Sequence, residues 1–330
     1  MSILVTGGTG LVGSHLLLKL CLTSENEIKA IYRSQDKVDK VKQLFYFEGK
    51  EDLFKKIDWI KADINNQESL EEVFKGIRFV YHSAAKVSFN KRDYNELIRT
   101  NSDATATIVN LCLDNGVEKM CYVSSVAALG NYLENKCVDE KAAWQKTDST
   151  SAYSISKFSG ENEVWRASEE GLNVVIVNPT TIIGYGDWGE SSLKIVKRVA
   201  DGLTFYPSGS NGFVGVKDVV NIMVELMNST IKNERFVLVS ENMKFKSIFD
   251  LIANELGKKN PKRKLAKKWA EYFLWVEQIR SFFGGNPVLT KSSLHTAYNH
   301  KCYSSEKIMT TLNYSFEKME SVIKNALKNY

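Results

Sequence analysis

The stretch ILVTGGTGLVG at residues 3–13 decides the fold of this chain. A short apolar run ends there in a turn with glycines at 7, 10 and 13, and a helical pattern begins at Leu11. Glycine permits positive φ, lets a pyrophosphate approach the backbone and lets a helix pack tightly on a strand. The amino end of the helix offers free N–H groups to phosphates. A strand, a glycine turn and a helix in this order predict a dinucleotide-binding turn.

Short apolar runs alternate with helical patterns over the first half of the chain. Strands are predicted at 3–5, 28–32, 57–60, 79–82, 120–123 and 174–177, and helices at 11–22, 69–74, 94–113 and 151–169. This alternation predicts an α/β fold with a Rossmann-type, doubly wound parallel sheet that helices cover on both faces.

The regular alternation of predicted strands and helices ends after Pro179. A loop-rich part is followed by two more strands, at 213–216 and 236–239, around a helix at 218–227, and the rest is mostly helical. We therefore expect an NAD(P)-binding domain made of 1–179 and 212–242. A smaller, mostly helical substrate-binding domain is expected from 180–211 and 243–330.

Composition excludes several classes of protein. The 330 residues are 43% hydrophobic, enough for a full core, and the net charge of +5 is too small to imply a nucleic-acid partner. No apolar run approaches the ~18 residues of a membrane span, and no signal peptide precedes the glycine turn, so a cytoplasmic protein is expected. Five cysteines, an odd number without a Cys-x-x-Cys pair, predict reduced core residues and no metal site; they are Cys21, Cys112, Cys121, Cys137 and Cys302.

Tyr153 and Lys157 form the most informative pair in the chain. Four residues apart on a predicted helix, they project from one face. A free phenol has a pKa of about 10, and an adjacent ammonium with a positive nicotinamide lowers that pKa toward neutrality. The third member of the set is expected to be a hydroxyl just past the strand at 120–123, where Ser124 and Ser125 stand.

These features together resemble the extended short-chain dehydrogenase/reductase superfamily, which includes the NAD(P)-dependent epimerases and dehydratases. The resemblance extends to the segment 178–184, Asn-Pro-x-x-x-x-Gly where the family has Arg-Pro, and to the segment 213–220. It implies that Ser125 orients a substrate carbonyl, that Tyr153 moves the proton, and that Lys157 tunes Tyr153 and holds the ribose. It also implies a supporting role for Asn101, whereas His82 is interpreted as a packed strand-end residue.

The resemblance further implies which residues contact the cofactor. They are Gly7, Thr9, Gly10, Leu11, Val12, Gly13, Arg33, Lys40, Asp63, Ile64, Ala84, Ala85, Lys86, Tyr153, Lys157, Pro179 and Thr180. Arg33 stands where NAD-preferring proteins have an acid, and a guanidinium suits a 2′-phosphate, so NADP is the expected cofactor. NAD stays as the alternative because Asp36 and Asp39 lie nearby and Arg33 can be an ordinary exposed charge.

Several short segments resemble dihydroflavonol-4-reductase-like and 3β-hydroxysteroid-dehydrogenase-like members. They are 87–89, Arg33 with Lys40, and 286–290 followed by 303–307. The resemblance implies an NADP-dependent oxidoreductase that moves hydride between the nicotinamide and a ketone or secondary alcohol of an apolar small molecule. Substrate contacts are expected from the segment 265–290 and from Val87, Phe89, Ser125, Asn178, Ile183 and Tyr185.

Two other functions stay open. An NAD-dependent nucleotide-sugar 4-epimerase would use the same Tyr, Lys and Ser, although Arg33 argues against it. A non-catalytic NAD(P)-binding redox sensor is the other alternative, although such proteins typically lack the Tyr/Lys pair. Val126 and Ala127 stand where related dehydratases carry an Asp-Glu pair, which argues against dehydration.

Two surface features have two interpretations each. Seven basic residues lie within 258–268, and aromatic residues follow at helical spacing. This pattern indicates either a substrate-domain helix after a solvated charge run or peripheral contact with a membrane. The helices at 94–113 and 151–169 form a homodimer interface in similar proteins, but an intramolecular cover would give the same apolar pattern.

Overall fold

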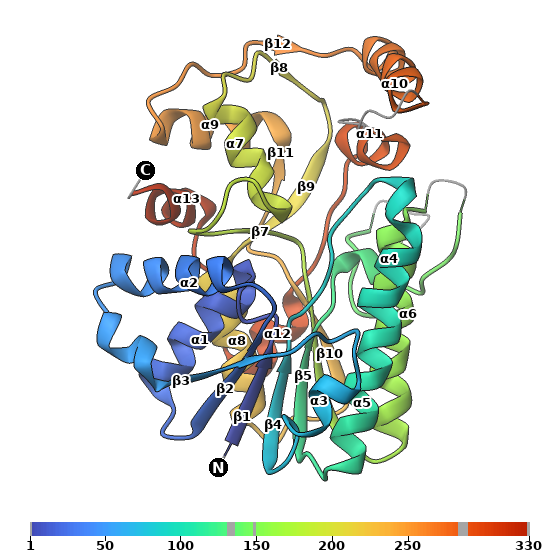
Figure 1. The fold of residues 1–330 in the computed structure, drawn as a ribbon. Helices are drawn as coiled ribbons and strands as arrows, with labels where there is room; N and C mark the ends of the chain where they lie inside the picture. Colours follow the sequence, from blue (N-terminus) through green and yellow to red (C-terminus); the bar gives the residue numbers. More distant parts are fainter. Residues whose placement is uncertain (1, 131–135, 148–149, 283–289, 329–330) are drawn as a thin grey trace.

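A computed structural model describes residues 2–130, 136–147, 150–282 and 290–328, and its centre is a seven-stranded sheet. The strand order is β10-β6-β5-β4-β1-β2-β3, and every neighbouring pair is parallel. The strands are β1 (Ser2–Thr6), β2 (Glu27–Tyr32), β3 (Ile57–Lys61), β4 (Ile77–His82), β5 (Lys119–Val123), β6 (Asn173–Pro179) and β10 (Glu234–Leu238). All seven carboxyl ends therefore lie at one edge of the sheet, and the predicted doubly wound fold is confirmed (Figure 1).

Helices cover both faces of this sheet (Figure 1). One face carries α1 (Leu11–Thr23), α2 (Gln35–Phe47) and α8 (Val216–Asn228), and the other carries α3 (Glu68–Glu71), α4 (Tyr94–Ile98), α5 (Ala104–Asp114) and α6 (Ala152–Glu169). Successive residues of a strand point to opposite faces. Accordingly Val175 and Val177 of β6 belong to the first core, while Val174 and Ile176 belong to the second. Burial on both faces explains why the strands are apolar throughout.

Three local elements differ from the sequence expectation. The helix expected at 94–113 is broken by a π-helical segment, Arg99–Asp103, between α4 and α5. The short α3 ends at Glu71, earlier than expected. The helix α2 was not expected, although its buried residues 38, 41, 44 and 45 follow helical spacing. A 3-10 helix, Glu51–Lys56, follows α2.

A second, smaller body lies over the carboxyl edge of the large sheet, and we call it the upper lobe (Figure 1). It contains a three-stranded sheet in the order β11-β9-β7, where the strands are β11 (Glu241–Lys244), β9 (Ser210–Gly215) and β7 (Thr181–Ile183). The short strands β8 (Phe205–Tyr206) and β12 (Arg263–Lys264) pair beside it. Its helices are α7 (Lys194–Ala200), α9 (Phe245–Glu255), α10 (Lys267–Phe282), α11 (Lys291–Tyr298) and α13 (Met319–Leu327), while α12 (Glu306–Leu312) lies near β10.

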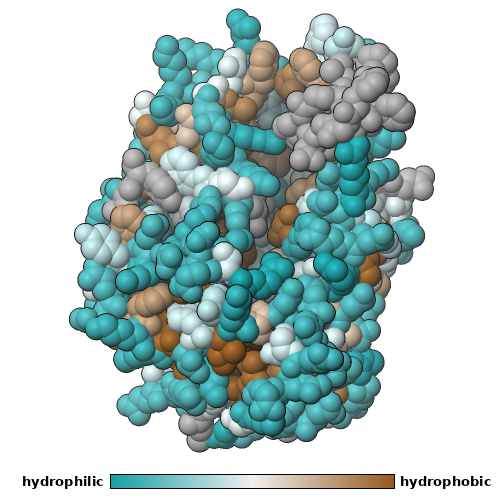
Figure 2. Space-filling view, viewed as in Figure 1, coloured by the Kyte–Doolittle hydropathy of each residue, from teal (hydrophilic) through white to brown (hydrophobic). Residues whose placement is uncertain are grey.

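The surface seen in Figure 2 is mostly hydrophilic, and its hydrophobic atoms gather in small patches, some of them at the hollow between the upper lobe and the large sheet. Within the described residues no helix is both long and apolar enough to cross a bilayer.

The expectation of five reduced cysteines was wrong for two of them. Cys137 and Cys302 form a disulfide, whereas Cys21, Cys112 and Cys121 are free and buried. The backbone explains the pairing, because Val138 N donates to Cys302 O (2.8 Å) and the two Cα atoms of the cysteines lie 4.5 Å apart. The partners are 165 residues apart in sequence, so spacing gave no signal.

Candidate active site

The glycine turn has the geometry expected for a phosphate cradle. Gly7 has a φ of 71°, and a Cβ on it would lie 2.5 Å from the backbone nitrogen of Ala84 at the end of β4. A Cβ on Gly13 would lie 2.1 Å from the carbonyl oxygen of Gly7. No side chain caps the amino end of α1, so its N–H groups point free toward the carboxyl edge of the sheet. The turn therefore fits a bound pyrophosphate, which would use these N–H groups.

Charged residues follow β2 and β3 at the carboxyl edge of the large sheet, on the side of the glycine turn where those two strands lie. Burial raises the pKa of Asp63, but hydrogen bonds from Asn65 and the charges of Arg33 and Arg99 outweigh it, so this pKa lies below its ordinary value. Arg33 is exposed, and it lies close enough to Asp63 for its charge to act on that carboxylate. Lys40, the other expected phosphate contact, lies instead in an ion pair with Asp187 (Nζ–Oδ2 2.6 Å). Arg33 and Arg99 are therefore the two exposed cations whose charges act on Asp63.

Asn101 fixes the segment that follows β4. Its Oδ1 accepts from Lys86 N (2.7 Å), and its Nδ2 donates to Lys86 O and to Ser156 Oγ (both 2.9 Å). Asn101 lies on the π-helical segment, a feature frequent at functional sites. It thus ties Ala84–Lys86, expected beside the cofactor, to α6. The side chain of Lys86 itself pairs with Glu96.

His82 is a packed residue in the structure. Its Nδ1 lies 2.6 Å from Thr6 Oγ1, its Nε2 lies 3.0 Å from Thr105 Oγ1, and its ring stacks on that of Tyr122. Burial, together with the charge of Lys157, lowers the pKa of His82 to about 3. The imidazole is neutral at pH 7 and reaches no exposed surface, which is the packing role expected for it.

Ser125 and Tyr153 meet where β5 ends and α6 begins. Ser151 caps α6 by accepting from Ser154 N (3.0 Å), which places Tyr153 in the first turn. Ser125 Oγ accepts from Ala127 N (3.1 Å) and shares a hydrogen bond with the Tyr153 phenol. Burial raises the pKa of Tyr153, and this hydrogen bond lowers it. The two hydroxyls therefore lie close together where β5 ends and α6 begins.

Lys157 lies one turn further along α6 and is buried. Its Nζ donates to Val123 O (2.8 Å) and to the Tyr122 hydroxyl (3.1 Å). Burial lowers the pKa of Lys157 to about 7, while the charge of Glu161 raises it. The ammonium is therefore held beside the end of β5, one turn of α6 after Tyr153.

Glu161 is a buried residue behind the candidate site that the sequence analysis missed. It is 2% exposed and accepts hydrogen bonds from Ser124 Oγ (2.5 Å), Asn178 Nδ2 (2.7 Å) and Arg235 Nη1 (2.9 Å). The signal was present, because Glu161 continues the four-residue spacing of Tyr153 and Lys157 on the same helix face. Asn178, expected to contact substrate, is fully buried and donates to Ser125 O (3.1 Å) and Glu161. Its side chain therefore supports the backbone of Ser125 and offers no exposed surface, and the expected substrate contact stays a prediction.

The other expected substrate residues divide into two groups. Phe89 is 46% exposed, and its ring meets that of Tyr153 edge-on at 5.8 Å, with the exposed Val87 two residues away. Ile183 is 1% exposed in the core of the upper lobe, so it offers no surface to a substrate. Tyr185 packs against Phe47 of α2, on the other helix layer. The apolar wall beside Tyr153 is thus made by the segment after β4.

Two further sets of expected contacts belong to the end of β6 and to the segment 265–290. Pro179 and Thr180 are buried at the end of β6, where Thr180 Oγ1 donates to Leu238 O (3.0 Å), so only their backbone side can face a cofactor. The segment 265–290, expected over the substrate, is described up to residue 282 and at residue 290. The motif at 286–290 therefore lies almost entirely outside the described residues.

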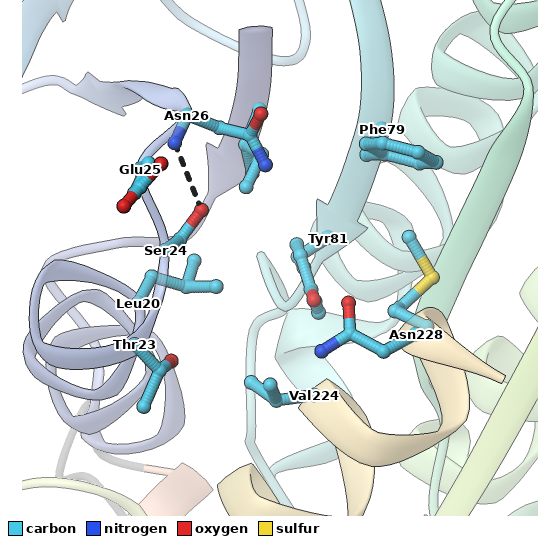
Figure 3. Close-up of a pocket in the computed structure, with 11 residues that line it drawn as sticks. Leu20, Thr23, Ser24, Glu25, Asn26, Phe79, Tyr81, Val224 and Asn228 are labelled. Carbon is cyan, nitrogen blue, oxygen red and sulfur yellow. Dashed lines mark hydrogen bonds between the residues drawn. The ribbon is translucent and has the colours of Figure 1, made fainter. Parts of the chain in front are cut away.

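A separate cavity of about 280 Å³ lies at the opposite end of the strands (Figure 3). Its walls come from the start of β1, from β4 and from the last turns of α1 and α8; they are Ile3, Leu20, Thr23, Ser24, Glu25, Asn26, Phe79, Tyr81, Val224, Met227 and Asn228. None of the expected site residues lines it. The expected site residues lie instead at the carboxyl edge, which is where ligands of open α/β sheets bind.

Comparisons with known proteins agree with this geometry. The chain is 27% identical to a Synechocystis protein provisionally named dihydroflavonol 4-reductase, over 98% of this chain and 91% of the relative. It is 26% identical to the anthocyanidin reductase of Arabidopsis thaliana, over 78% of this chain and 81% of the relative.

Among solved structures, that of gox2253 has a TM-score of 0.80 at 24% identity, over 99% of this chain and 97% of the other. The UDP-glucose 4-epimerase of Thermotoga maritima has a TM-score of 0.77 at 18% identity, over 99% and 98%. These two likenesses show the shared fold. The model of the NAD dependent epimerase/dehydratase family matches residues 3–238. The chain, with its glycine turn, its Ser125–Tyr153 pair and Lys157, belongs to the NAD dependent epimerase/dehydratase family.

Proposed function

We propose that this protein is an NADP-dependent oxidoreductase that interconverts a ketone and a secondary alcohol on an apolar small molecule. The observation that carries the proposal is the hydrogen-bonded pair of Ser125 and Tyr153, at the same carboxyl edge of the sheet as the glycine turn. A carbonyl oxygen placed between the two hydroxyls would accept a hydrogen bond from one and a proton from the other.

Each catalytic residue has one task. When bound, the nicotinamide supplies or accepts the hydride at the substrate carbon. In reduction, Ser125 donates a hydrogen bond to the carbonyl oxygen, and Tyr153 gives that oxygen its proton. The positive charge of Lys157, one turn away, favours the phenolate that remains. In oxidation the same steps run backward, so Tyr153 takes the proton of the alcohol.

Exposed apolar side chains support an apolar substrate. Val87 and Phe89 are 38% and 46% exposed, and Phe89 contacts the ring of Tyr153. An exposed aromatic ring at a reacting group gives affinity to a flat or apolar substrate. The upper lobe lies over this point and, in this proposal, is the substrate-binding domain, made of residues 180–211 and 243–330.

Arg33 supports NADP as the cofactor. It is exposed at the end of β2, next to Asp63, where a 2′-phosphate of a dinucleotide on the glycine turn would lie. A guanidinium binds a phosphate through two parallel hydrogen bonds. Lys40 takes no part in this proposal, because it is paired with Asp187.

The test is titration of the full chain with NADPH and NADH, followed by turnover of flavonoid-like ketones, steroid-like ketones and UDP-sugars. We expect tighter binding of NADPH and turnover of the apolar ketones. Tyr153→Phe should lower kcat by about 10²–10⁴-fold and retain NADPH binding, whereas Tyr46→Phe, an exposed tyrosine on α2, should change neither.

Three outcomes contradict the proposal. Interconversion of UDP-sugars without net use of NADPH would make the protein an epimerase. Binding of NADPH without turnover of any ketone or UDP-sugar would make it a sensor. Full turnover by Tyr153→Phe would remove Tyr153 from the mechanism.

A further inference from the structure

Exposed aromatic side chains form one face of α10 at the end of the upper lobe. Trp269, Tyr272 and Phe273 are 63%, 54% and 51% exposed, and their spacing places them on adjacent turns of one side. We call these three residues the aromatic face. The other side of α10 is held in place, because Ala270 and Leu274 are buried together with Leu294 of α11.

A basic run leads directly into this face. Residues 258–268 hold seven basic side chains, all exposed, and Glu271 is the single acid between 258 and 273. Within the part of the chain that the structure describes, none of the seven takes part in an ion pair. Arg263 and Lys264 form β12, whose partner β8 carries another exposed aromatic residue, Phe205. Figure 1 shows α10, β8 and β12 at the same end of the molecule, remote from the amino terminus.

An open cavity borders the basic run. It has a volume of about 420 Å³ and is lined by Ser208, Lys264, Leu265, Ala266, Lys267 and Tyr298. Two lysines among the lining residues of one open cavity suit an anionic group such as a phosphate.

We propose that the aromatic face and the basic run dock on the surface of an anionic phospholipid bilayer. Trp and Tyr side chains are stable at the boundary between headgroups and acyl chains, where the ring is in an apolar layer and its polar tip is in water, and Phe buries its apolar ring in the same layer. Lysine side chains around them reach the lipid phosphates, and each basic residue strengthens binding to an anionic surface roughly fivefold.

The combination of features selects this partner over others. An acidic protein would satisfy the charge but would leave the exposed rings of the aromatic face in contact with a polar partner. A neutral apolar partner would leave seven basic residues unmatched. An anionic bilayer satisfies both, and it is also where an apolar substrate of the proposed reaction would be dissolved. The docking itself does not depend on that reaction.

The test measures vesicle binding by the purified full-length protein, without any assay of activity. Vesicles of phosphatidylcholine alone are compared with vesicles containing about one third phosphatidylglycerol, by co-sedimentation. We expect at least roughly tenfold stronger binding to the anionic vesicles, weakened by added salt. Trp269→Ala with Phe273→Ala, and separately Lys264→Glu with Lys267→Glu, should each weaken binding by roughly tenfold or more.

Two control variants make the same kinds of substitution at and next to α2, away from the aromatic face and the basic run. Tyr46→Ala removes an equally exposed aromatic ring from α2, and Lys50→Glu with Lys55→Glu reverses two exposed charges next to it; both should bind like the wild type. Thermal melting shows whether each variant is folded. Equal binding to both kinds of vesicle, or equal loss in the control variants, would overturn the proposal. Self-association that disappears with Trp269→Ala and Phe273→Ala, without vesicle binding, would assign the face to a second copy instead.

Discussion

At the scale of single residues, the carboxylate of Glu161 raises the pKa of the buried Lys157. Burial lowers the pKa of Lys157 to about 7 and the carboxylate of Glu161 opposes that shift, so a loss of the carboxylate lowers the pKa of Lys157 further. Since the ammonium is the form that favours the Tyr153 phenolate, the alkaline limb of the kcat/KM profile should move down by roughly one pH unit in Glu161→Gln. Glu163→Gln removes a partly exposed carboxylate from the same helix and should leave the profile unchanged. An identical profile in Glu161→Gln would show that Glu161 is only structural.

At the scale of elements, α6 is placed by its contact with the π-helical segment. A Cβ on Gly160 would lie 2.1 Å from the carbonyl oxygen of Asn101 and 2.8 Å from the hydroxyl of Tyr122. Alanine is the better helix former by about 1 kcal/mol, but the clash costs about 1–3 kcal/mol and moves α6 away from Asn101. Gly160→Ala should therefore lower the free energy of unfolding in urea and lower kcat. Asn162→Ala, at an exposed position of α6, should raise stability slightly through propensity alone. A Gly160→Ala protein as stable and active as the wild type would contradict this packing.

At the scale of the whole molecule, the disulfide joins two distant segments of the chain. Cys137 lies between Ser125 and Tyr153, and Cys302 lies between α11 and α12 in the upper lobe. A link across 165 residues restricts the unfolded chain, so Cys302→Ser should lower the free energy of unfolding by about 2–4 kcal/mol. Urea unfolding with and without reductant measures this, and reductant should destabilise the wild type but not the variant. Equal stability of the wild type and of Cys302→Ser, each with and without reductant, would show that the pairing of Val138 with Tyr303 is sufficient to hold the two segments together.

Assembly also belongs to this scale. Homodimer formation through α4, α5 and α6 stays a prediction, and Trp144 already covers one apolar residue of α6 by stacking on Phe158 at 4.2 Å. This contact favours the intramolecular interpretation of that face.

The sequence by itself determined the features that depend on neighbouring residues. The glycine turn, the strand before it and the helix after it follow from local backbone geometry, and the shared face of Tyr153 and Lys157 follows from the helical repeat. The alternation of strands and helices then determined the parallel sheet and the edge at which the site lies.

Only the tertiary structure decided which distant side chains meet. Lys40 pairs with Asp187 across 147 residues, Glu161 joins Ser124, Asn178 and Arg235 from three different segments, and Cys137 bonds to Cys302. It also decided that Asn178 and Ile183 are buried and that Phe89 is exposed beside Tyr153. The reason is physical: local backbone preferences act over a few residues, whereas these contacts depend on how the upper lobe, β10 and α6 pack against the sheet edge.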